Sequence, residues 1–584
     1  PDFQAPIDAD GDNTYEVTLG VSDGNGGEDT LAVDVIITGV TWAGSFRSAT
    51  VAATGKPKQV QFEWTYEGRA DQFILEANPD DVSGYAQVDL NGDGLVDDAD
   101  QLDSSQSSLA FSIALHLTDF TSASYRIVAR DDTDAEIARS SDIGLDTLVV
   151  EDLVGRLDDG ISELTYYGYS VATSADGNTV VIGAMLGNLD NGEAYLFERE
   201  NGSWNNPIRL MATHGNTTDR FGVSVDISAD GSTVVVGADR EDSNATGING
   251  SGGDNSANDA GAAYVFQLGS DGAWSQTDYL KASNTDPGDK FGTEVRISGD
   301  GNTIAVGAPG EASSALTIDG NETDNAVVGS GAVYVFTRTT ESWEQQAYLK
   351  SEINTASVGY AIQNTLAISA DGDTIAAGAL HVQDVGTVQV FNRSELGEWT
   401  VGERVAPDVL DNYDNFGYSV ALSADGDRLA VGAIQEDGYG DPVGADATDN
   451  SGTGVGAAYV FMHSGSGWTQ AAYLKAINGE DTDNFGANLE FSDDGRILAV
   501  ASFAEDSLQT GVNADGSDNS RTERGAVYVF SEDDGGSWQH RSYVKPPHAD
   551  LLSWPERFGR GLALDGDGDK LFVGSRTLGE VFTY

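Results

Sequence analysis

One pattern occurs seven times between residues 167 and 575, and this repetition restricts the fold more than any other feature of the chain. Its consensus is F-G-x-S-V-x-I-S-x-D-G-x-T-x-x-V-G-A. The leading pairs are Tyr167-Gly168, Phe221-Gly222, Phe291-Gly292, Ile362-Gln363, Phe416-Gly417, Phe485-Gly486 and Phe558-Gly559. An Asp follows each pair at one fixed spacing: Asp176, Asp230, Asp300, Asp371, Asp425, Asp494 and Asp567. Repetition this regular indicates a structural unit that packs against copies of itself.

Each copy supplies short β-rich segments joined by Asp-Gly and Asn-Gly turns, which is the pattern of a four-stranded antiparallel sheet. Six copies end in a strand that begins with Trp, at Trp204, Trp274, Trp343, Trp399, Trp468 and Trp538. The seventh copy stops at Tyr584 without such a strand, so another segment must cover its edge. The stretch Thr147–Val154 is the natural candidate. We therefore expect an all-β chain with a seven-bladed β-propeller over residues 146–584.

The repeats resemble the FG-GAP repeats of the integrin α-chain propeller and of its bacterial relatives in large surface proteins. The full signature stands at Phe291-Gly292 and Gly307-Ala308-Pro309, and other copies keep the FG and GA pairs without the proline. Integrin-type blades often carry a D-x-D-x-D-G calcium loop between their first two strands, whereas this chain has only tight turns there, such as residues 229–232. We expect the seven Asp residues to serve as hairpin-turn residues, and we do not transfer the integrin calcium sites.

Four copies carry long connections of equal length between their second and third strands, at residues 239–260, 310–330, 434–455 and 503–524. Equal length and fixed Glu, Asp and Asn positions predict folded loops. Two interpretations compete for their acidic residues. The side chains cap the loop backbone through Asx-turns, or they hold Ca²⁺. Capping is favoured because no loop has a known calcium spacing. The residues that calcium would use are Asp242, Asp254, Asp437, Asp449, Asp506 and Asp518.

The up-and-down topology of a propeller would place all four long loops on one face. In the integrin resemblance, that face binds the ligand. We therefore expect the partner, a glycan or a protein on a cell surface, to contact residues 239–260, 310–330, 434–455 and 503–524.

The part of the chain before residue 146 predicts two more β-domains. In residues 1–40, alternating strands at Thr14–Ser22 and Thr30–Thr38 resemble the C-terminal part of a cadherin-like repeat of the kind strung together in bacterial adhesins. In residues 41–145, the segments VQFEWTYEG, DQFILEANP and SYRIVARD predict a β-sandwich. This sandwich resembles fibronectin type III and related Ig-like modules.

Residues 89–100, DLNGDGLVDDAD, predict a calcium site within the sandwich. Side-chain oxygens stand at positions 1, 3, 5, 9 and 12 of an EF-hand-type loop, a carbonyl at position 7 and the turn glycine at position 6. Asp at position 12 replaces the usual Glu, as in dockerin-type loops, so we expect a modest affinity. The predicted Ca²⁺ ligands are Asp89, Asn91, Asp93, Leu95, Asp97 and Asp100.

Composition excludes several classes of partner and chemistry. With 95 acidic and 30 basic residues the net charge is −65, which opposes binding to nucleic acid or anionic membranes. Cysteine is absent, which removes disulfides and thiol chemistry. No apolar run approaches the ~20 residues of a membrane span, so direct membrane insertion is not expected. The N-terminal sequence resembles the middle of a domain, and we expect the chain to belong to a longer multidomain protein.

Catalytic motifs are not apparent. The six histidines are scattered without paired metal-ligand spacing, and no G-x-S-x-G occurs. We expect a non-enzymatic, calcium-stabilised ligand-binding region of a secreted or cell-surface bacterial adhesin. The alternatives are a glycan-active enzyme on a propeller scaffold and a structural spacer without a ligand.

Overall fold

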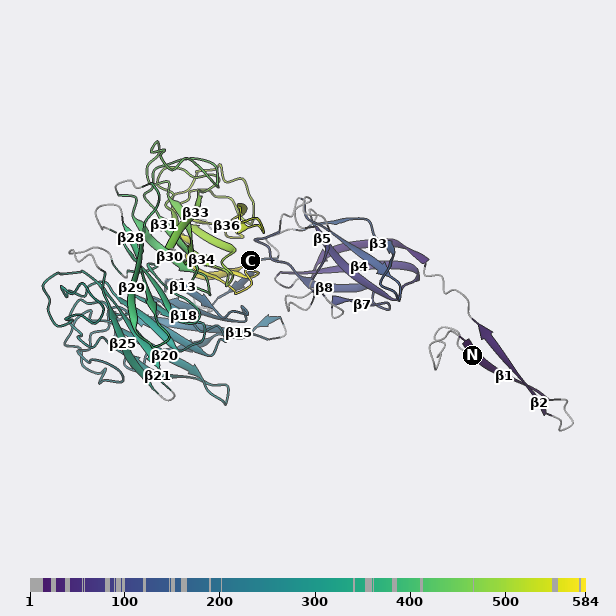
Figure 1. Ribbon diagram of the computed structural model, residues 1–584, viewed down its shortest axis with the longest axis horizontal. Coiled ribbons are helices and arrows are strands. Elements are labelled where there is room, and N and C mark those ends of the chain that lie inside the picture. The colour runs from purple at the N-terminus through teal and green to yellow at the C-terminus, as the bar shows by residue number, and fades with distance from the viewer. Residues whose placement is uncertain are drawn as a thin grey trace. The chain divides into compact units, whose positions relative to one another are not determined.

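The computed structural model divides into two compact units, Pro1–Thr54 with Val60–Phe111 and Phe120–Thr147, and Gly55–Gln59 with Ser112–Asp119 and Leu148–Tyr584. Every secondary-structure element is a β-strand (Figure 1), which confirms the all-β prediction over the described residues. Among them, no helix is long and apolar enough to span a membrane. The structure describes residues 14–22, 28–36, 43–54, 56, 58–78, 85–88, 90, 96, 100–118, 122–145, 148, 153–158, 165–187, 191–200, 202–339, 342–351, 360, 362–380, 386–409, 413–465, 467–548, 555–576 and 579–584.

The first unit begins with an antiparallel hairpin, β1 (Thr14–Ser22) and β2 (Glu28–Ile36), which are the two strands expected near the N-terminus. Two further antiparallel sheets follow. One contains β3 (Ala43–Ala53), β4 (Gln59–Arg69) and β8 (Ser108–Ser112). The other contains β5 (Gln72–Asn78), β6 (Ala86–Gln87), β7 (Leu102–Asp103), β9 (Ser124–Arg130), β10 (Glu136–Arg139) and β11 (Ile143–Gly144).

The period-two pattern of β4 explains how these two sheets pack. Val60, Phe62 and Trp64 are buried and alternate with more exposed residues, because successive side chains of a strand point to opposite faces. The ring of Trp64 lies 5.7 Å from that of Phe73 on β5, and the ring of Phe62 lies 5.1 Å from that of Tyr125 on β9. One face of each sheet therefore forms the shared core.

The second unit consists of seven antiparallel sheets in chain order, each with four strands except the first, which has five. We number the sheets one to seven. The first six are β13 (Tyr167–Thr173), β14 (Thr179–Ala184), β15 (Glu193–Glu200), β16 (Ser203–Trp204), β17 (Ile208–Leu210); β18 (Val225–Ile227), β19 (Thr233–Ala238), β20 (Ala262–Leu268), β21 (Trp274–Leu280); β22 (Glu294–Ile297), β23 (Thr303–Ala308), β24 (Ala332–Arg338), β25 (Trp343–Leu349); β26 (Leu366–Ile368), β27 (Thr374–Ala379), β28 (Thr387–Arg393), β29 (Trp399–Val405); β30 (Phe416–Leu422), β31 (Arg428–Ala433), β32 (Ala457–Ser464), β33 (Gly467–Leu474); and β34 (Phe485–Phe491), β35 (Ile497–Ser502), β36 (Ala526–Glu532), β37 (Trp538–Val544). Five of the six predicted Trp strands are continuous, while the segment from Trp204 to Leu210 is divided into β16 and β17.

The seventh sheet joins the two ends of the second unit, in the order β12 (Gly155–Leu157), β40 (Glu580–Thr583), β39 (Leu571–Ser575) and β38 (Phe558–Leu564). Closure by a segment before the first copy was expected, but the predicted segment Thr147–Val154 was wrong. The pairing strand starts at Gly155, where Gly155 and Leu157 are buried while Arg156 points outward to Glu580. A short alternating strand fits this edge, whereas the preceding apolar run has no such alternation.

The seven sheets follow one another in a closed cycle. Each first strand contacts the first strand of the next sheet, and β38 contacts β13. Figure 1 shows β13, β18, β30 and β34 gathered near the middle of this unit. The hairpin turns after the first strands also form a ring of backbone hydrogen bonds that returns to its start. The links are Ala175 N to Ala229 O, Ala229 N to Gly299 O, Asp300 N to Ala370 O, Ala370 N to Ala424 O, Ala424 N to Asp493 O, Asp493 N to Gly566 O and Gly566 N to Ala175 O, each 2.8–3.0 Å long.

Paired glycines meet at five of the seven contacts between neighbouring sheets. A Cβ added to Gly432, at the end of β31, would lie 2.0 Å from the carbonyl oxygen of Gly486, the second residue of β34. No side chain fits at such a distance, because the two backbones are already in contact. The same approach joins Gly183 to Gly222, Gly237 to Gly292, Gly378 to Gly417 and Gly574 to Gly168. The FG and GA pairs of the sequence are therefore the points at which adjacent sheets touch.

The fourth copy departs from the predicted pattern. Its leading pair was assigned to Ile362-Gln363, but Tyr360 forms the bridge to Ala379 that the aromatic residue makes elsewhere, as Phe416 does with Ala433. Tyr360 is fully buried in the core next to Leu366 and Ala379. An aromatic ring is needed to fill this space, and Tyr360 supplies it from two residues further upstream.

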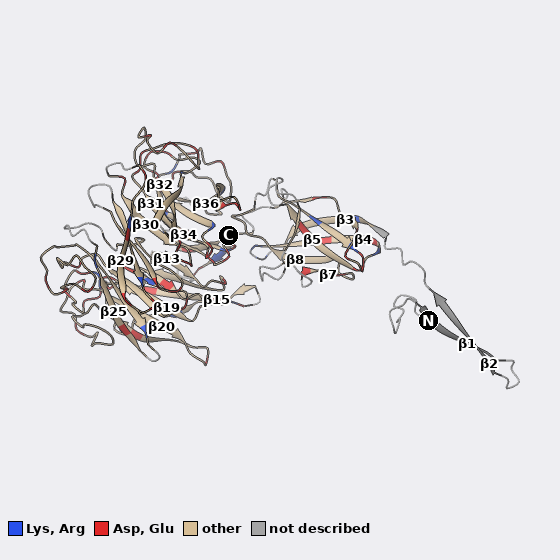
Figure 2. Cartoon of the chain, viewed as in Figure 1, with Lys and Arg blue, Asp and Glu red and all other residues tan. Residues whose placement is uncertain are grey.

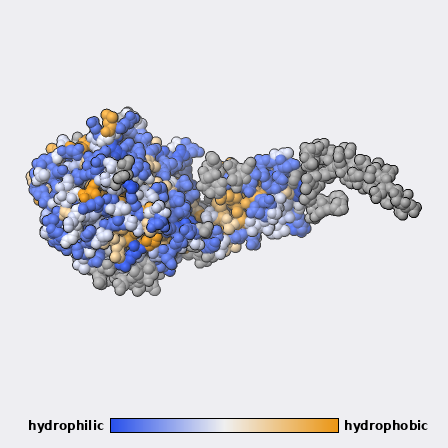
Figure 3. Space-filling view, turned by 90° about the horizontal axis from the view of Figure 1, so that it is seen from below, coloured by the Kyte–Doolittle hydropathy of each residue, from blue (hydrophilic) through white to orange (hydrophobic). Residues whose placement is uncertain are grey.

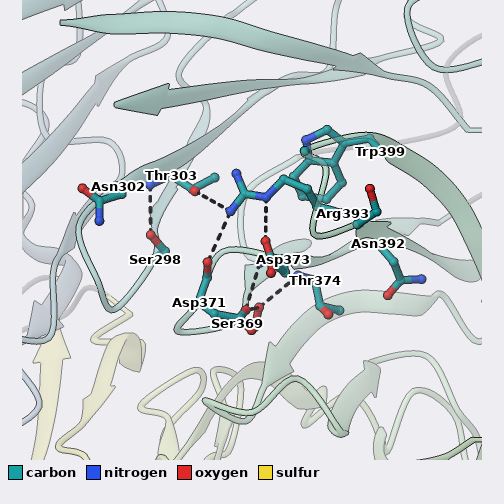
Figure 4. A network of polar contacts seen from close by, with 12 residues as sticks. Ser298, Asn302, Thr303, Ser369, Asp371, Asp373, Thr374, Asn392, Arg393 and Trp399 are labelled. Carbon is teal, nitrogen blue, oxygen red and sulfur yellow. Dashed lines mark hydrogen bonds and ion pairs between the residues drawn. The ribbon is translucent and has the colours of Figure 1, made fainter. Parts of the chain in front are cut away.

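Six of the seven repeated Asp residues accept hydrogen bonds within the hairpin turns. Oδ1 of Asp371 accepts from the Ser369 hydroxyl at 2.6 Å and from the Asp373 amide at 2.9 Å, and Asp176, Asp230, Asp300, Asp425 and Asp494 make the equivalent pair of bonds. In Figure 4 Arg393 reaches from β28 over this turn, bonding Asp373 at 2.6 Å and the Thr303 hydroxyl of the third sheet at 3.0 Å. The turns therefore also link neighbouring sheets.

Candidate functional site

The four long loops and the connections between successive sheets lie on one side of the second unit. In an antiparallel sheet the second-to-third connection and the exit from the fourth strand fall at the same end. We call this side the loop face: residues 239–260, 310–330, 434–455 and 503–524, together with residues 211–220, 281–290, 406–409, 413–415 and 475–484. The structure describes all four predicted loops in full.

The predicted metal ligands of these loops accept hydrogen bonds from the loop backbone. Asp242, Asp437 and Asp506 each accept from an amide seventeen residues later, at 2.7–2.8 Å, which ties the start of the loop to its end. Asp254 accepts from Ser256 N at 2.7 Å in an Asx-turn. Asp449 and Asp518 make the same turn and also accept from an amide ten residues earlier. These bonds order each loop through its own backbone.

The Asn of three of the four Asp-Asn pairs reaches the connection that precedes its sheet. Asn255 Oδ1 accepts from Asn216 at 3.1 Å, Asn325 donates to Asp286 at 2.9 Å, and Asn519 donates to Glu480. The pair therefore has two separate roles, because the Asp shapes the loop and the Asn attaches it to the neighbouring connection.

A left-handed residue hooks each loop onto the outer strand of its own sheet. Asn249 has φ +56°, donates its amide to Tyr279 O at 2.8 Å and accepts from Tyr279 N at 3.0 Å. Asp319 and Asn513 repeat this exchange with Tyr348 and Tyr543. Asn and Asp tolerate this conformation better than other side chains, which explains their presence here.

A buried ion pair stands at the root of every long loop. The Glu that begins the loop pairs with the Lys that follows the fourth strand, with both side chains at most 4% exposed. Lys281 Nζ lies 2.8 Å from Glu241 Oε2, and Lys350 Nζ lies 2.8 Å from Glu311 Oε2. The other pairs are Lys475 with Glu436 and Lys545 with Glu505. Removing one partner of such a pair costs about 3–5 kcal/mol, because the other charge is left buried alone.

Tyrosine and asparagine side chains complete two of these roots. Tyr543 donates to Glu505 Oε1 at 2.5 Å. Asn478 donates to the same oxygen at 3.2 Å and accepts from the Tyr528 hydroxyl at 2.7 Å. In the third sheet Asn284 bonds Glu311 and Tyr334 in the same way. Each carboxylate is therefore held by several donors, which fixes the position of the loop above it.

One aspartate beside each of three roots has a strongly raised pKa. Burial raises the pKa of Asp219, Asp289 and Asp483 to about 7, and the carboxylates of Glu241, Glu311 and Glu505 add to the shift. Each also accepts one backbone hydrogen bond, such as Asn216 N to Asp219 at 2.7 Å. These aspartates exchange protons near neutral pH, directly behind the long loops.

The predicted calcium loop of the first unit lies largely outside the described residues, which exclude Asp89, Asn91, Asp93, Leu95 and Asp97. Asp100 is described and fully buried, and its Oδ1 accepts from Leu90 N at 2.7 Å. A buried carboxylate facing the start of the loop fits the twelfth position of an EF-hand-type site. Within the ranges that the structure covers, no three His, Cys, Asp or Glu residues are grouped to hold a metal.

The sequence did not point to a second site, which is a cavity of about 180 Å³ lined by residues of the seven first strands. At one end lie the residues of the backbone ring, from Ala175 to Gly566. Near the other end, Arg560 donates to the Tyr169 hydroxyl at 2.8 Å, and this hydroxyl donates to Gln363 at 2.8 Å. These three residues bridge the first, fourth and seventh sheets. We call this space the axial cavity.

Charged side chains of both signs line the axial cavity (Figure 2 shows acidic and basic residues together around β13). They are Asp226, Glu294, Arg296, Glu490, Asp493 and Arg560. Three of these occupy one repeat position, Asp226, Arg296 and Glu490, where the other four sheets have Ala172, Ala367, Ala421 and Ala563. Burial raises the pKa of Glu490 to about 8, and Asp226, Glu294 and Asp493 add to this shift while Arg296 opposes it.

Sequence reasoning found the loops but missed the groups that hold them. The Lys after each fourth strand recurs at Lys281, Lys350, Lys475 and Lys545, and its spacing of 39 or 40 residues from the Glu of the loop was the available signal. The sequence signal for the axial cavity is weaker. It is a charged residue at a strand position that is Ala in most repeats, and it indicates a cavity only once the first strands are known to meet at the centre.

Stability should rise as the pH falls from about 8 to about 5, because of Asp219, Asp289 and Asp483. Their folded pKa of about 7 exceeds the ordinary 3.8, so the folded state binds protons that the unfolded state does not. This contribution is complete below about pH 4 and is lost as the pH rises through about 7. Chemical unfolding of the triple variant D219N/D289N/D483N should lose this dependence, on the order of a few kcal/mol. The exposed control Asp441→Asn should keep it, and an unchanged pH profile in the triple variant would contradict the assignment.

Comparison with known proteins agrees with this architecture. The family model described as the FG-GAP repeat matches residues 204–266 and 274–336, which run from an outer Trp strand through three strands of the next sheet. No curated protein is significantly similar in sequence to the chain. Similar solved structures include hydrazine synthase of Kuenenia stuttgartiensis, with 12% identity, a TM-score of 0.44 and coverage of 73% of this chain and 97% of that chain. The chain therefore contains FG-GAP repeats, in a propeller-like set of antiparallel sheets.

Proposed function

We propose that the seven sheets are the blades of a closed seven-bladed propeller, and that this propeller is a non-enzymatic module that binds a glycan or a protein on another surface. The observation that carries the proposal is the set of four loops with one construction on one face. Backbone caps, left-handed hooks and buried ion pairs order these loops before any ligand arrives. Preorganised loops lose less entropy on binding, which is the property expected of a recognition surface.

Exposed apolar side chains support the loop face as the place of contact. Among the residues that the structure describes, six of the ten large exposed hydrophobic ones lie there: Met211, Leu316, Val328, Tyr413, Tyr439 and Ile477. Val328 is 71% exposed and Tyr413 67%. The surface visible in Figure 3 is otherwise mainly hydrophilic, with apolar residues in separate spots. Aromatic and aliphatic residues set among polar loops are typical of binding surfaces for proteins and sugars.

The remaining parts of the proposal concern context. The first unit is proposed to be the end of a cadherin-like stalk followed by an Ig- or fibronectin III-like adaptor, and the whole to be an extracellular adhesin segment. Support comes from the β1–β2 hairpin and the two packed sheets of the first unit. The strongly acidic composition, with a net charge of −65, suits an environment rich in salt or divalent cations.

Calcium is proposed at residues 89–100, and its removal tests the site. Replacing Asp100 by Asn should weaken calcium binding by about tenfold or more, since a ligand carboxylate loses one charge and one oxygen. The rise in unfolding temperature between chelator and calcium should shrink in this variant. The exposed control Asp132→Asn should behave as the unmodified chain. If calcium raised the unfolding temperature of Asp100→Asn as much as that of the unmodified chain, the proposed site would be contradicted.

Ligand binding is tested on glycan and peptide arrays, with calcium and then with chelator. The full chain should give a hit that survives chelation, because the loops are ordered without metal. The variants Val328→Ala with Leu316→Ala, and Tyr439→Ala with Ile477→Ala, should each weaken the hit by about tenfold or more.

The matched control is Leu268→Ala with Leu396→Ala, because these residues are as exposed but lie at the opposite, third-to-fourth strand end. Equal loss in the control would place the contact elsewhere. Turnover of a glycan on the array would favour the enzymatic alternative, and no hit in either condition would favour the spacer.

A further inference from the structure

The carboxylates that line the axial cavity outnumber its guanidinium groups. Four carboxylates, those of Asp226, Glu294, Glu490 and Asp493, line it with only two guanidinium groups, those of Arg296 and Arg560. Burying an uncompensated charge is costly, so such a site favours either protonation or a bound cation.

Arg296 is held by three contacts, none of which involves Glu490. Its Nε donates to Leu366 O at 3.1 Å and its Nη1 to Val295 O at 3.2 Å, while its Nη2 lies 2.7 Å from Glu294 Oε1. This Glu294 oxygen is buried and accepts no hydrogen bond of good geometry among the described residues. The one cation at the centre of the cavity is therefore committed to two carbonyls and one carboxylate.

The other charged groups are also engaged, with two exceptions, Glu490 and Asp493, of which Asp493 is exposed to solvent. Asp226 accepts from Ile227 N at 2.9 Å and from Ile297 N at 2.7 Å. Arg560 is held at the far end by Tyr169 and Gln363. Glu490 lines the cavity from β34, and in the described structure no hydrogen bond or ion pair is recorded for its carboxylate. Glu490 is the less exposed of these two carboxylates and is therefore the candidate group for an occupant of the cavity.

We propose that the axial cavity binds a small organic ammonium ion, with its N–H groups donating to the carboxylate of Glu490. The volume of about 180 Å³ admits a molecule of several heavy atoms, since one water takes about 30 Å³. A primary amine fits better than a quaternary one, because the lining has carboxylates for N–H donors and only Tyr169 and Phe491 as aromatic rings among the described residues. A metal ion fits less well, because the covered part of the chain groups no three metal-ligating side chains.

The repeats contain the matched variants. Glu490→Ala restores the residue that four sister sheets carry at this position, so the strand should fold normally. Glu490→Gln keeps the shape and removes the charge. Glu344, an exposed residue of β25 outside the cavity, provides the control Glu344→Ala. Thermal unfolding of each variant checks that the chain is folded.

The experiment is calorimetric titration with methylammonium and ethanolammonium, and with methanol and ethylene glycol as neutral analogues of similar size. The amines should bind the full chain, while the neutral analogues should bind at least about tenfold more weakly. Both Glu490 variants should lose about tenfold or more in amine affinity, and Glu344→Ala should lose none.

A second readout is independent of affinity. Glu490 faces Asp226 on β18, Glu294 and Arg296 on β22, and Asp493 in the turn after β34, and it is largely protonated at pH 7. Binding of an ammonium ion should release this proton, so the measured enthalpy should vary with the ionisation enthalpy of the buffer. Equal binding of neutral analogues, unchanged affinity in the Glu490 variants, or no amine binding to the folded full chain would each overturn the proposal. None of these results bears on ligand capture at the loop face.

Discussion

The contact between paired glycines of neighbouring sheets is the constraint on which the second unit depends. Gly432 and Gly486 approach so closely that even a methyl group would overlap a carbonyl oxygen. This approach brings the first strands together around one axis and sets the spacing of the sheets. The aromatic residue beside the glycine, such as Phe485, then packs against Tyr528 and Phe530 of its own sheet. The glycines of the FG and GA pairs thus form the contact between sheets, while the aromatic residue of the FG pair fills the core of its own sheet.

Both candidate sites follow from this arrangement. Because the sheets share one orientation, their second-to-third connections leave at the same end, and four of them extend into the ordered loops. The buried pairs of Glu241 with Lys281 and its three counterparts hold those loops at their roots. At the axis, the same packing brings together seven strand positions. Small residues such as Ala172 and Ala421 leave space there, into which Asp226, Arg296 and Glu490 project charge. The repeated sheet therefore provides the common scaffold, and the charged residues that replace Ala at one repeat position give the axial cavity its polar lining.

Local sequence signals predicted what local physics determines. The hairpin-turn Asp residues, the Trp strands and the strands of the first unit could be placed from turn residues and alternation. The closing strand could not be placed in this way. Thr147–Val154 is more apolar than Gly155–Leu157 and looked like the better strand, but Gly155–Leu157 is the segment that pairs in register with β40. Tyr360 was missed because its place in the fourth sheet depends on filling a cavity and not on spacing. The pairing of Lys281 with Glu241 and the meeting of Glu490 with Arg296 are consequences of tertiary structure, which no single segment reveals.

The measurement that tests this account most directly is the unfolding free energy of Gly432→Ala. The added methyl would lie 2.0 Å from Gly486 O and 2.3 Å from Ser419 Oγ. The account predicts a loss of about 1–3 kcal/mol, the usual cost of overpacking. It also predicts that Gly465→Ala, where nothing lies within 4 Å, leaves stability unchanged. A Gly432→Ala chain as stable as the Gly465→Ala control would contradict the claim that glycine contacts hold the sheets together.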